Sequence, residues 1–358
     1  MWIEISSDTF VKAEFKSLNF LYQILSWYPS DSSSRYEIFV NTELVKNTNN
    51  YKQLKSIEAD LDLFLDTQFN DFVTSQPQNA IKDYTVTYRK SRTFFEVEEA
   101  IQFFNQPVLI ILENNKNDSA FVLAIIEYFG KENSINKSKT HYENNWIRFE
   151  NAGGCKNIPN VVESFLKSFE QLALKNKRHR SDYFRGLIII DSDREYDNQP
   201  SKHDATLLRL NNLGIINGKI HILKKRMMEN YLPNGVFEEL RTKYQRNPQV
   251  NKDLINWINV YLSLPLNSQG LNEKQNYLNI QKGKLHGSET PVPVDLTTLY
   301  TLSKAQFDIL NAGFKLESFK NKFPLLFLSS SVVNKFTLTQ RCENNELQEI
   351  MDKINQLI

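Results

Sequence analysis

Apolar and polar positions follow a regular alternation between residues 107 and 223. Short apolar runs alternate there with amphipathic stretches of helical length. The runs are Val108–Leu112, Trp146–Phe149, Leu187–Ile190 and Lys219–Leu223, and the helical stretches between them are Ser119–Phe129, Pro159–Leu174 and Ala205–Leu213. Leu, Ile and Val without a polar break are typical of strands buried on both faces of a parallel sheet. The alternation therefore predicts an α/β fold with a parallel sheet flanked by helices.

The chain on either side of this segment follows other patterns. Residues 1–106 combine helical spacing with two strand-like runs, which predicts an α+β N-terminal region of unknown role. The expected elements are helices at Phe10–Tyr28, Leu54–Val73 and Val97–Phe104 and strands at Tyr36–Val40 and Tyr84–Tyr88. Residues 236–358 form a mainly helical C-terminal region with a long polar loop around 265–294. We therefore expect three regions, 1–106, 107–235 and 236–358.

Composition limits the classes of partner. The chain has 43 basic and 42 acidic residues, a net charge of +1, so its overall charge does not attract nucleic acid or anionic lipid. Any polyanion site must be a local basic patch. The two cysteines, Cys155 and Cys342, exclude a disulfide framework and fit a reducing compartment. There is no secretory signal and no apolar run near the ~20 residues that span a bilayer. We expect a soluble, cytoplasmic protein with no membrane partner.

Acidic residues follow the predicted strands at the points where those strands end. Glu113 follows the first strand, and Asp118 stands at the expected N-cap of the next helix. Asp191 and Asp193 follow the third strand, and Glu229 follows the fourth. Because ligands bind beyond the carboxyl ends of parallel strands, these carboxylates should meet at one edge. Oxygen ligands of this kind suit Mg²⁺ or Mn²⁺.

Two further motifs complete the expected site. Gly153 and Gly154 form a turn after the second strand, with backbone amides that can point outward near the acids. Lys225 and Arg226 follow the fourth strand and are candidates for neutralising a phosphate. Two metal ions ~3.5–4 Å apart can stabilise both the entering and the leaving oxygen in phosphodiester cleavage. The pattern therefore points to metal-dependent phosphodiester hydrolysis.

The order of these motifs resembles the TOPRIM domain. A strand ending in Glu113, the Gly-Gly turn, the Asp191–Asp193 pair and a Glu-Asn-Tyr-Leu-Pro segment beginning at Glu229 are similar to the version in overcoming-lysogenization-defect (OLD) nucleases and their relatives in bacterial phage defence. The resemblance implies a compact parallel sheet that binds Mg²⁺. It also implies that Glu113 is the catalytic glutamate, that the two aspartates are metal ligands, and that Asp118 and Glu229 assist them.

The resemblance implies a nuclease of DNA or RNA in anti-phage defence, often beside an ATPase supplied by a separate chain. The absence of a Gly-x-x-x-x-Gly-Lys-Ser/Thr motif fits that division of labour. One departure from the family is Asn114, where a glycine usually follows the catalytic glutamate. Asparagine tolerates a left-handed backbone well, so we expect the turn to survive.

Other interpretations of the same residues remain. Asp-x-Asp pairs commonly line loops, and the basic run Lys175–Arg180 is either a phosphate contact or a solvated linker. Cys155 has no identifiable His–Asp pair and is expected to be a small packed residue. The alternative function is a non-cleaving, TOPRIM-like binding or regulatory subunit of a defence complex. A sugar transferase would use Asp-x-Asp but would leave Glu113 unexplained. The oligomeric state, homo-oligomers included, stays open.

Overall fold

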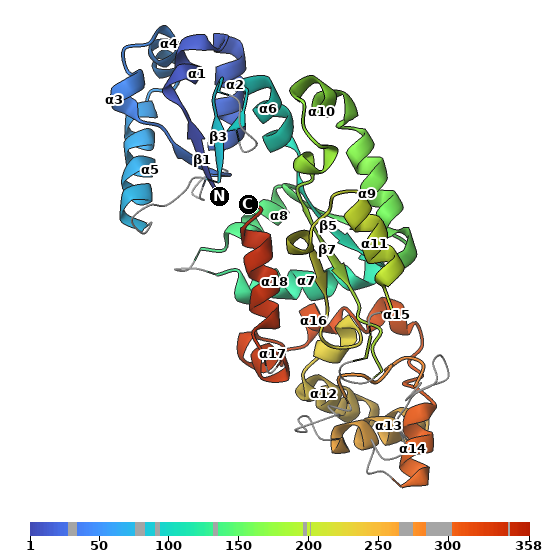
Figure 1. Cartoon of the computed structure of the whole chain (residues 1–358). Coiled ribbons are helices and arrows are strands. Elements are labelled where there is room, and N and C mark those ends of the chain that lie inside the picture. Colours follow the sequence, from blue (N-terminus) through green and yellow to red (C-terminus); the bar gives the residue numbers. More distant parts are fainter. Residues whose placement is uncertain are drawn as a thin grey trace.

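The computed structural model shows an α/β protein with two parallel, four-stranded sheets (Figure 1). It describes residues 1–27, 34–75, 83–89, 94–131, 135–195, 199–200, 202–264, 275–283, 303–342 and 344–358. The first sheet belongs to the N-terminal region and the second to the region between residues 107 and 223. The α/β class and the parallel sheet expected from the hydrophobic pattern are thereby confirmed.

The first sheet has the strand order β2-β1-β3-β4, and every neighbouring pair is parallel. Its strands are β1 (Trp2–Ile5), β2 (Glu37–Phe39), β3 (Tyr84–Val86) and β4 (Phe94–Phe95). Its helices are α1 (Ser7–Lys12), α2 (Phe15–Ser26), α3 (Thr42–Val45), α4 (Asn49–Ile57), α5 (Leu61–Ser75) and α6 (Val97–Asn105). The expectation of an α+β region was wrong because parallel pairing between strands far apart in the chain is set by tertiary structure. The strands β1 and β4 were not predicted, and β1 pairs with both β2 and β3.

The second sheet has the order β6-β5-β7-β8, also parallel throughout. Its strands are β5 (Val108–Leu112), β6 (Ile147–Asn151), β7 (Gly186–Ile190) and β8 (Ile220–Ile222). All five residues of both central strands, β5 and β7, are buried. Alternate side chains enter different cores: Ile110 and Ile189 lie in one apolar cluster, and Ile111 and Ile188 in another. This two-sided burial explains the unbroken apolar runs in the sequence.

Helices cover both faces of the second sheet. They are α7 (Asn115–Phe129), α8 (Lys137–Glu143), α9 (Ile158–Lys167) and α11 (Asp204–Asn212), whereas the buried side chains of α10 (Glu170–Asn176) belong to the core of the first sheet. The short 3₁₀ turns are η1 (Cys155–Asn157), η2 (Arg180–Tyr183), η3 (Asn217–Lys219) and η4 (Met228–Tyr231). Val162 of α9 and Leu210 of α11 share one core with Ile188, whereas Phe121 of α7 lies in the other core with Ile189.

The C-terminal helices continue the α7 core rather than forming a separate one. They are α12 (Asn234–Tyr244), α13 (Lys252–Ser263), α14 (Lys304–Asn311), α15 (Phe319–Lys322), α16 (Leu326–Ser329), α17 (Lys335–Cys342) and α18 (Glu346–Asn355). Most of the expected loop around 265–294 lies outside the described residues. Residues 275–283 are described, and Leu278 and Ile280 within them are fully buried in this core. That part of the loop is therefore structural.

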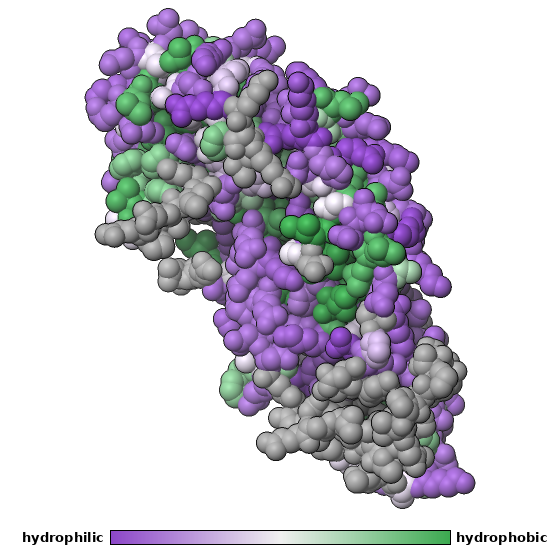
Figure 2. All heavy atoms as spheres, viewed as in Figure 1, coloured by the Kyte–Doolittle hydropathy of each residue, from purple (hydrophilic) through white to green (hydrophobic). Residues whose placement is uncertain are grey.

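The face drawn in Figure 2 is mainly hydrophilic. Within the described part of that face, apolar side chains form separate patches rather than one continuous band (Figure 2). Scattered exposed apolar residues are normal for globular proteins and need no partner to explain them.

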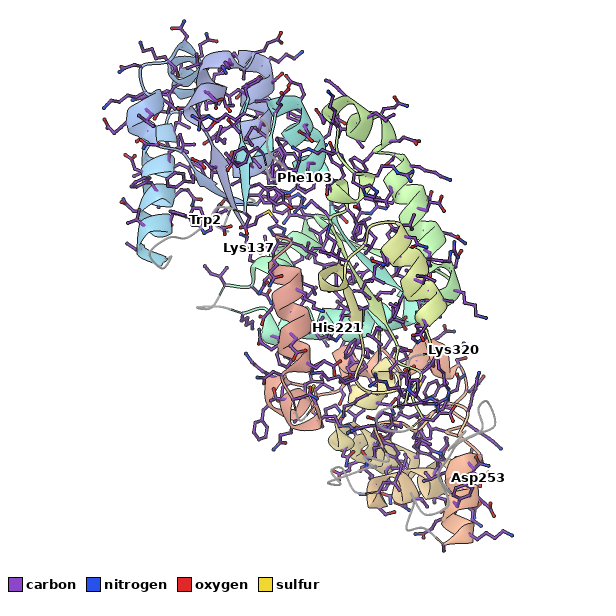
Figure 3. The ribbon with its side chains drawn as sticks, viewed as in Figure 1. Trp2, Phe103, Lys137, His221, Asp253 and Lys320 are labelled. Atoms are coloured by element: carbon purple, nitrogen blue, oxygen red, sulfur yellow. The ribbon has the colours of Figure 1, made fainter. Side chains whose placement is uncertain are left out.

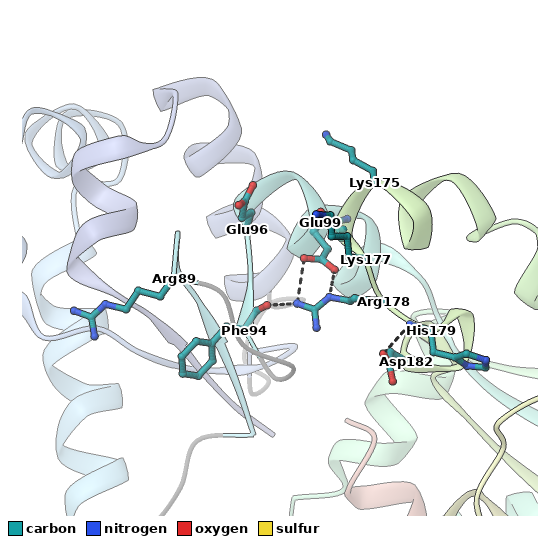
Figure 4. Close-up of a pocket in the computed structure, with 10 residues that line it drawn as sticks. Arg89, Phe94, Glu96, Glu99, Lys175, Lys177, Arg178, His179 and Asp182 are labelled. Carbon is teal, nitrogen blue, oxygen red and sulfur yellow. Dashed lines mark hydrogen bonds and ion pairs between the residues drawn. The ribbon is translucent and has the colours of Figure 1, made fainter.

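A buried ion pair joins the two sheet regions. Arg178, between α10 and η2, donates through Nε to the carboxylate of Glu99 in α6 (Figure 4). Tyr183 Oη donates to the same carboxylate at 2.6 Å. The guanidinium also donates to the Phe94 carbonyl and lies 4.8 Å from the ring centroid of Phe95. The Arg178 side chain is 10% exposed and that of Glu99 is 3% exposed, so solvent screens the pair weakly.

This pair gives a stability prediction. Because removing one partner leaves an uncompensated buried charge, we expect Arg178→Met or Glu99→Leu alone to lower the free energy of unfolding by about 3–5 kcal/mol. The double variant should recover much of that stability, since no charge is then stranded. Urea unfolding of the wild type, the two single variants and the double variant gives the four free energies of this double-mutant cycle. The control Lys167→Met breaks an exposed pair with Glu163 and should cost less than about 1 kcal/mol. Additive single effects would contradict the coupling.

Candidate acidic site at the strand ends

The carboxylates predicted from the sequence meet at one edge of the second sheet. Oε1 of Glu113, at the end of β5, accepts a hydrogen bond from the backbone N–H of Asp191, at the end of β7, at 3.2 Å. Asp193 and Asp118 lie close enough to raise the pKa of Glu113. The charge of Glu229 in turn helps to raise the pKa of Asp191. All five acids, distant in sequence, therefore share one electrostatic environment.

The Asp191–Asp193 loop is fixed by the segment that follows β8. The N–H of Asp193 donates to the Arg226 carbonyl at 3.0 Å, and the buried hydroxyl of Ser192 donates to the Lys225 carbonyl at 2.7 Å. Asp193 is exposed and has a left-handed backbone with φ of 52°. Aspartate tolerates this conformation better than most residues, so the loop can present its carboxylate outward at a low conformational cost.

Asp118 lies inside the first turn of α7, not at the N-cap position that the sequence predicted, because the helix begins at Asn115. Its Oδ2 accepts the Asn114 N–H at 2.8 Å. Asn114 has φ of −140°, an extended backbone, so the expected left-handed turn after Glu113 is wrong. Asparagine is accommodated there because no positive φ is required.

The glycine turn holds Glu113 rather than presenting free amides. The N–H of Gly154 donates to the Glu113 carbonyl at 2.9 Å, and the N–H of Gly153 donates to the side chain of Asn151 at 3.2 Å. The φ angles of Gly153 and Gly154 are 71° and 121°, which explains the glycines. The expectation of outward-pointing amides is therefore wrong at these two glycines, whose hydrogen bonds tie β6 to β5. It holds for the next residue of the turn, because the backbone N–H of Cys155 donates to the Glu113 carboxylate and lowers its pKa.

Burial and mutual repulsion raise the pKa values of these acids. Burial, followed by the charges of Asp193 and Asp118, raises the pKa of Glu113 to about 7. Burial raises the pKa of Asp118 to about 6 and, with the charge of Asp118, that of Glu229 to about 7. Burial and neighbouring carboxylates raise the pKa of Asp191 well above its ordinary value. At neutral pH such a cluster favours bound protons or cations.

Lys225 and Arg226 do not serve as the expected phosphate contacts. Both are buried, and Nζ of Lys225 donates to Asn276 Oδ1 and to the Arg341 carbonyl, each at 2.6 Å. Arg226 donates to the Tyr277 carbonyl. These side chains anchor the segment after β8 to residues far along the chain. The prediction that Lys225 and Arg226 neutralise a phosphate is therefore wrong, and both side chains are structural.

Lys320 is a cation that sequence reasoning missed. It is exposed on α15, beside the second sheet (Figures 1 and 3), and its charge acts on both Asp118 and Glu229. No motif marked Lys320, because only the fold of the C-terminal region brings α15 to the acids. The remainder of the Glu-Asn-Tyr-Leu-Pro segment is structural: Asn230 Nδ2 donates to the Gln275 carbonyl, and Tyr231 Oη donates to Glu346.

Cys155 has a histidine neighbour that the sequence did not reveal. Its Sγ lies 3.1 Å from Nδ1 of His203, at the start of α11. Burial and the charge of Glu113 raise the pKa of the Cys155 thiol to about 11. The thiol is therefore protonated at neutral pH, which argues against a nucleophile and agrees with a packed role.

The basic run Lys175–Arg180 lies at the opposite end of β7 from Asp191, because it precedes that strand. Residues 175–179 of this run line a cavity of about 670 Å³ between the two sheet regions, together with Glu99 and Arg89 (Figure 4). Arg178 is engaged by Glu99 there. This run cannot contact a phosphate held at the acidic site, since β7 spans ~16 Å at ~3.3 Å per residue.

The donor chemistry of the acidic site fits a hard cation. Carboxylate oxygens are the usual ligands of Mg²⁺, which keeps several waters and needs few protein ligands. In the described part of the chain, no three His, Cys, Asp or Glu residues form a ready-made metal-binding group as the side chains stand. The residues suited to hold such an ion are Asp191, Asp193 and Glu113, with Asp118 and Glu229 beside them.

Comparison of the chain with protein-family models, curated proteins and solved structures gives no significant match. The described residues include no helix that is both long enough and apolar enough to cross a membrane. The TOPRIM resemblance therefore stays a prediction from the sequence.

The raised pKa values predict how stability depends on pH. The pKa of Glu113 is 4.5 ordinarily and about 7 in the folded chain, so the folded state binds more protons between these values. Its contribution to the free energy of unfolding is present at low pH and disappears as the pH rises through 7. In EDTA, we expect Glu113→Gln to reduce the fall in Tm between pH 5.5 and pH 8, by roughly 2–4 °C for each kcal/mol removed.

Differential scanning fluorimetry measures this effect, with exposed Glu170→Gln in α10 as the control. Adding Mg²⁺ at pH 8 should raise the Tm of the wild type more than that of Glu113→Gln, because the ion binds only the folded site. An identical pH dependence in both proteins, with no response to Mg²⁺, would show that the acids are not coupled as described.

Proposed function

We propose that this protein is a Mg²⁺- or Mn²⁺-dependent nuclease that hydrolyses phosphodiester bonds of DNA or RNA. The observation that supports this most directly is the hydrogen bond from the Asp191 backbone to the Glu113 carboxylate, which brings two strand-end acids into one site. Five carboxylates with mutual electrostatic contact are costly to assemble unless cations are bound there. The resemblance to TOPRIM nucleases rests on these same acids.

Each residue receives a role from its position. Asp191 and Asp193 would hold the metal, assisted by Asp118 and Glu229. A bound ion would supply charge neutralisation for the phosphate oxygens and an activated water. Glu113, with a pKa near 7, is suited either to bind the ion or to accept a proton at neutral pH.

Lys320 replaces Lys225 and Arg226 as the proposed phosphate contact. It is exposed, and its charge lowers the pKa values of two of the acids, Asp118 and Glu229. An ammonium group there would neutralise a phosphate oxygen as negative charge develops. We place the activity in bacterial anti-phage defence with a separate ATPase chain, on the basis of the resemblance and the missing P-loop motif.

The central test is cleavage of labelled DNA and RNA in Mg²⁺ or Mn²⁺. Glu113→Gln should lower kcat by about 10²–10⁴-fold, because it removes a group that binds the ion or accepts the proton. Asp193→Asn keeps a residue that tolerates positive φ and should raise the metal concentration needed for half-maximal rate. Glu170→Gln is the matched control. Metal-dependent cleavage that survives Glu113→Gln would reject the mechanism. A wild type that binds strands without cutting, alone or with an ATPase, would support the regulatory-subunit alternative.

The short helix α15 offers a matched pair for testing Lys320. Lys320→Ala should lower kcat/KM at least tenfold, since it removes the cation whose charge acts on Asp118 and Glu229. Lys322→Ala removes an exposed lysine from the same helix and should leave kcat/KM within about twofold, as most surface changes do. Steady-state kinetics on one oligonucleotide compares them. Equal effects of the two substitutions would mean that Lys320 has no specific role.

A further inference from the structure

A second cavity, of about 350 Å³, lies directly beside the acidic site. Asp193 lines this cavity, and its charge also raises the pKa of Glu113, so the two sites share this residue. The other charged residues around it are Lys156, Lys202 and Arg209. The side of the cavity away from the acids therefore carries positive charge, in contrast to the negative acidic site next to it.

The charge of the cavity comes mainly from two residues. Nζ of Lys202 pairs with Oε1 of the buried Glu195 at 2.8 Å, so this lysine is largely neutralised. Lys156, in η1, and Arg209, in α11, are both exposed. Arg209 donates through Nη2 to the neutral Asn160 side chain at 2.6 Å, which orients the guanidinium without cancelling its charge. Arginine carries five donors in all, enough to bind an anion as well.

Buried side chains in contact with one another form the floor of the cavity. His203 and Thr206 are buried, and both lie against the sulfur of Cys155, at 3.1 and 3.8 Å. Cys155 begins η1, directly after the glycine turn whose Gly154 N–H is bound to the Glu113 carbonyl. Lys156 is thus connected to Glu113 through Gly154 and Cys155 alone, which fixes the spacing between the two sites.

We propose that this cavity binds a backbone phosphate of the nucleic-acid strand, next to the phosphate that lies at the acidic site. This inference rests on the proposed function. A ligand with a single phosphate would occupy one site only, whereas successive phosphates of a strand would engage both. The cavity selects for a polynucleotide over a mononucleotide and sets the register in which the strand lies over the acids.

The test is fluorescence anisotropy with a fluorescein-labelled, 12-nucleotide single strand of DNA or RNA in EDTA, where no cleavage occurs. The variant Lys156→Ala/Arg209→Ala should raise Kd about tenfold and make the salt dependence of log K shallower by ~0.7 for each phosphate that the protein no longer neutralises. The matched control, Lys16→Ala/Lys52→Ala, removes two exposed lysines from the N-terminal region and should change neither quantity. Lys156→Glu, a single exposed change, repeats the test without touching the hydrogen bond of Arg209.

A kinetic measurement separates this inference from the proposed function. In Mg²⁺, the double variant should raise KM with little change in kcat, because it removes binding that is equal in the ground state and the transition state. If the wild type cleaves and the double variant binds and cleaves like its control, the cavity inference falls and the proposed function stands. If the wild type cleaves nothing but the double variant binds the strand more weakly, the nuclease proposal falls and the cavity still binds phosphate. AMP that displaces the strand at equal concentration would overturn the selection for polynucleotides.

Discussion

The cost of burying carboxylates together governs the architecture of the second sheet. Glu113 and Asp191 end adjacent parallel strands, so the ladder between β5 and β7 fixes how close they come. Each acid loses hydration and gains an anionic neighbour, and the pKa values rise accordingly. A fold that maintains such an arrangement must hold it with interactions elsewhere, since the acids repel one another.

Those interactions come from the chain after β8. Lys225, Asn230 and Tyr231 are all buried and bind groups from residues 275–346. Glu346, fully buried at the start of α18, accepts from Tyr231 and from the backbone of Lys224. The backbone of the same segment binds the Asp191–Asp193 loop. The C-terminal region therefore supports the acidic site mechanically, in addition to supplying Lys320.

The polar groups around the site divide by sign. Acids occupy the strand ends, and the cations Lys156, Arg209 and Lys320 stand around them on η1, α11 and α15. A net charge of +1 conceals this separation, because the basic and acidic residues balance over the whole chain. Local attraction of a phosphate strand is compatible with a nearly neutral protein when the charges are arranged in this way.

The sequence by itself determined the second sheet and the acids at its edge. Buried central strands require unbroken apolar runs, and the ends of parallel strands must meet, so Glu113, Asp191 and Asp193 could be assigned from pattern alone. The strands β1 and β4 were not predicted, and the parallel order of the first sheet was missed, because pairing between strands far apart in the chain depends on tertiary structure. Whether a charged side chain near the site faces solvent or the interior depends on segments far along the chain. Tertiary structure alone buried Lys225 and Arg226, brought Lys320 to the acids, and placed His203 against Cys155, because local sequence carries no information about contacts between distant segments.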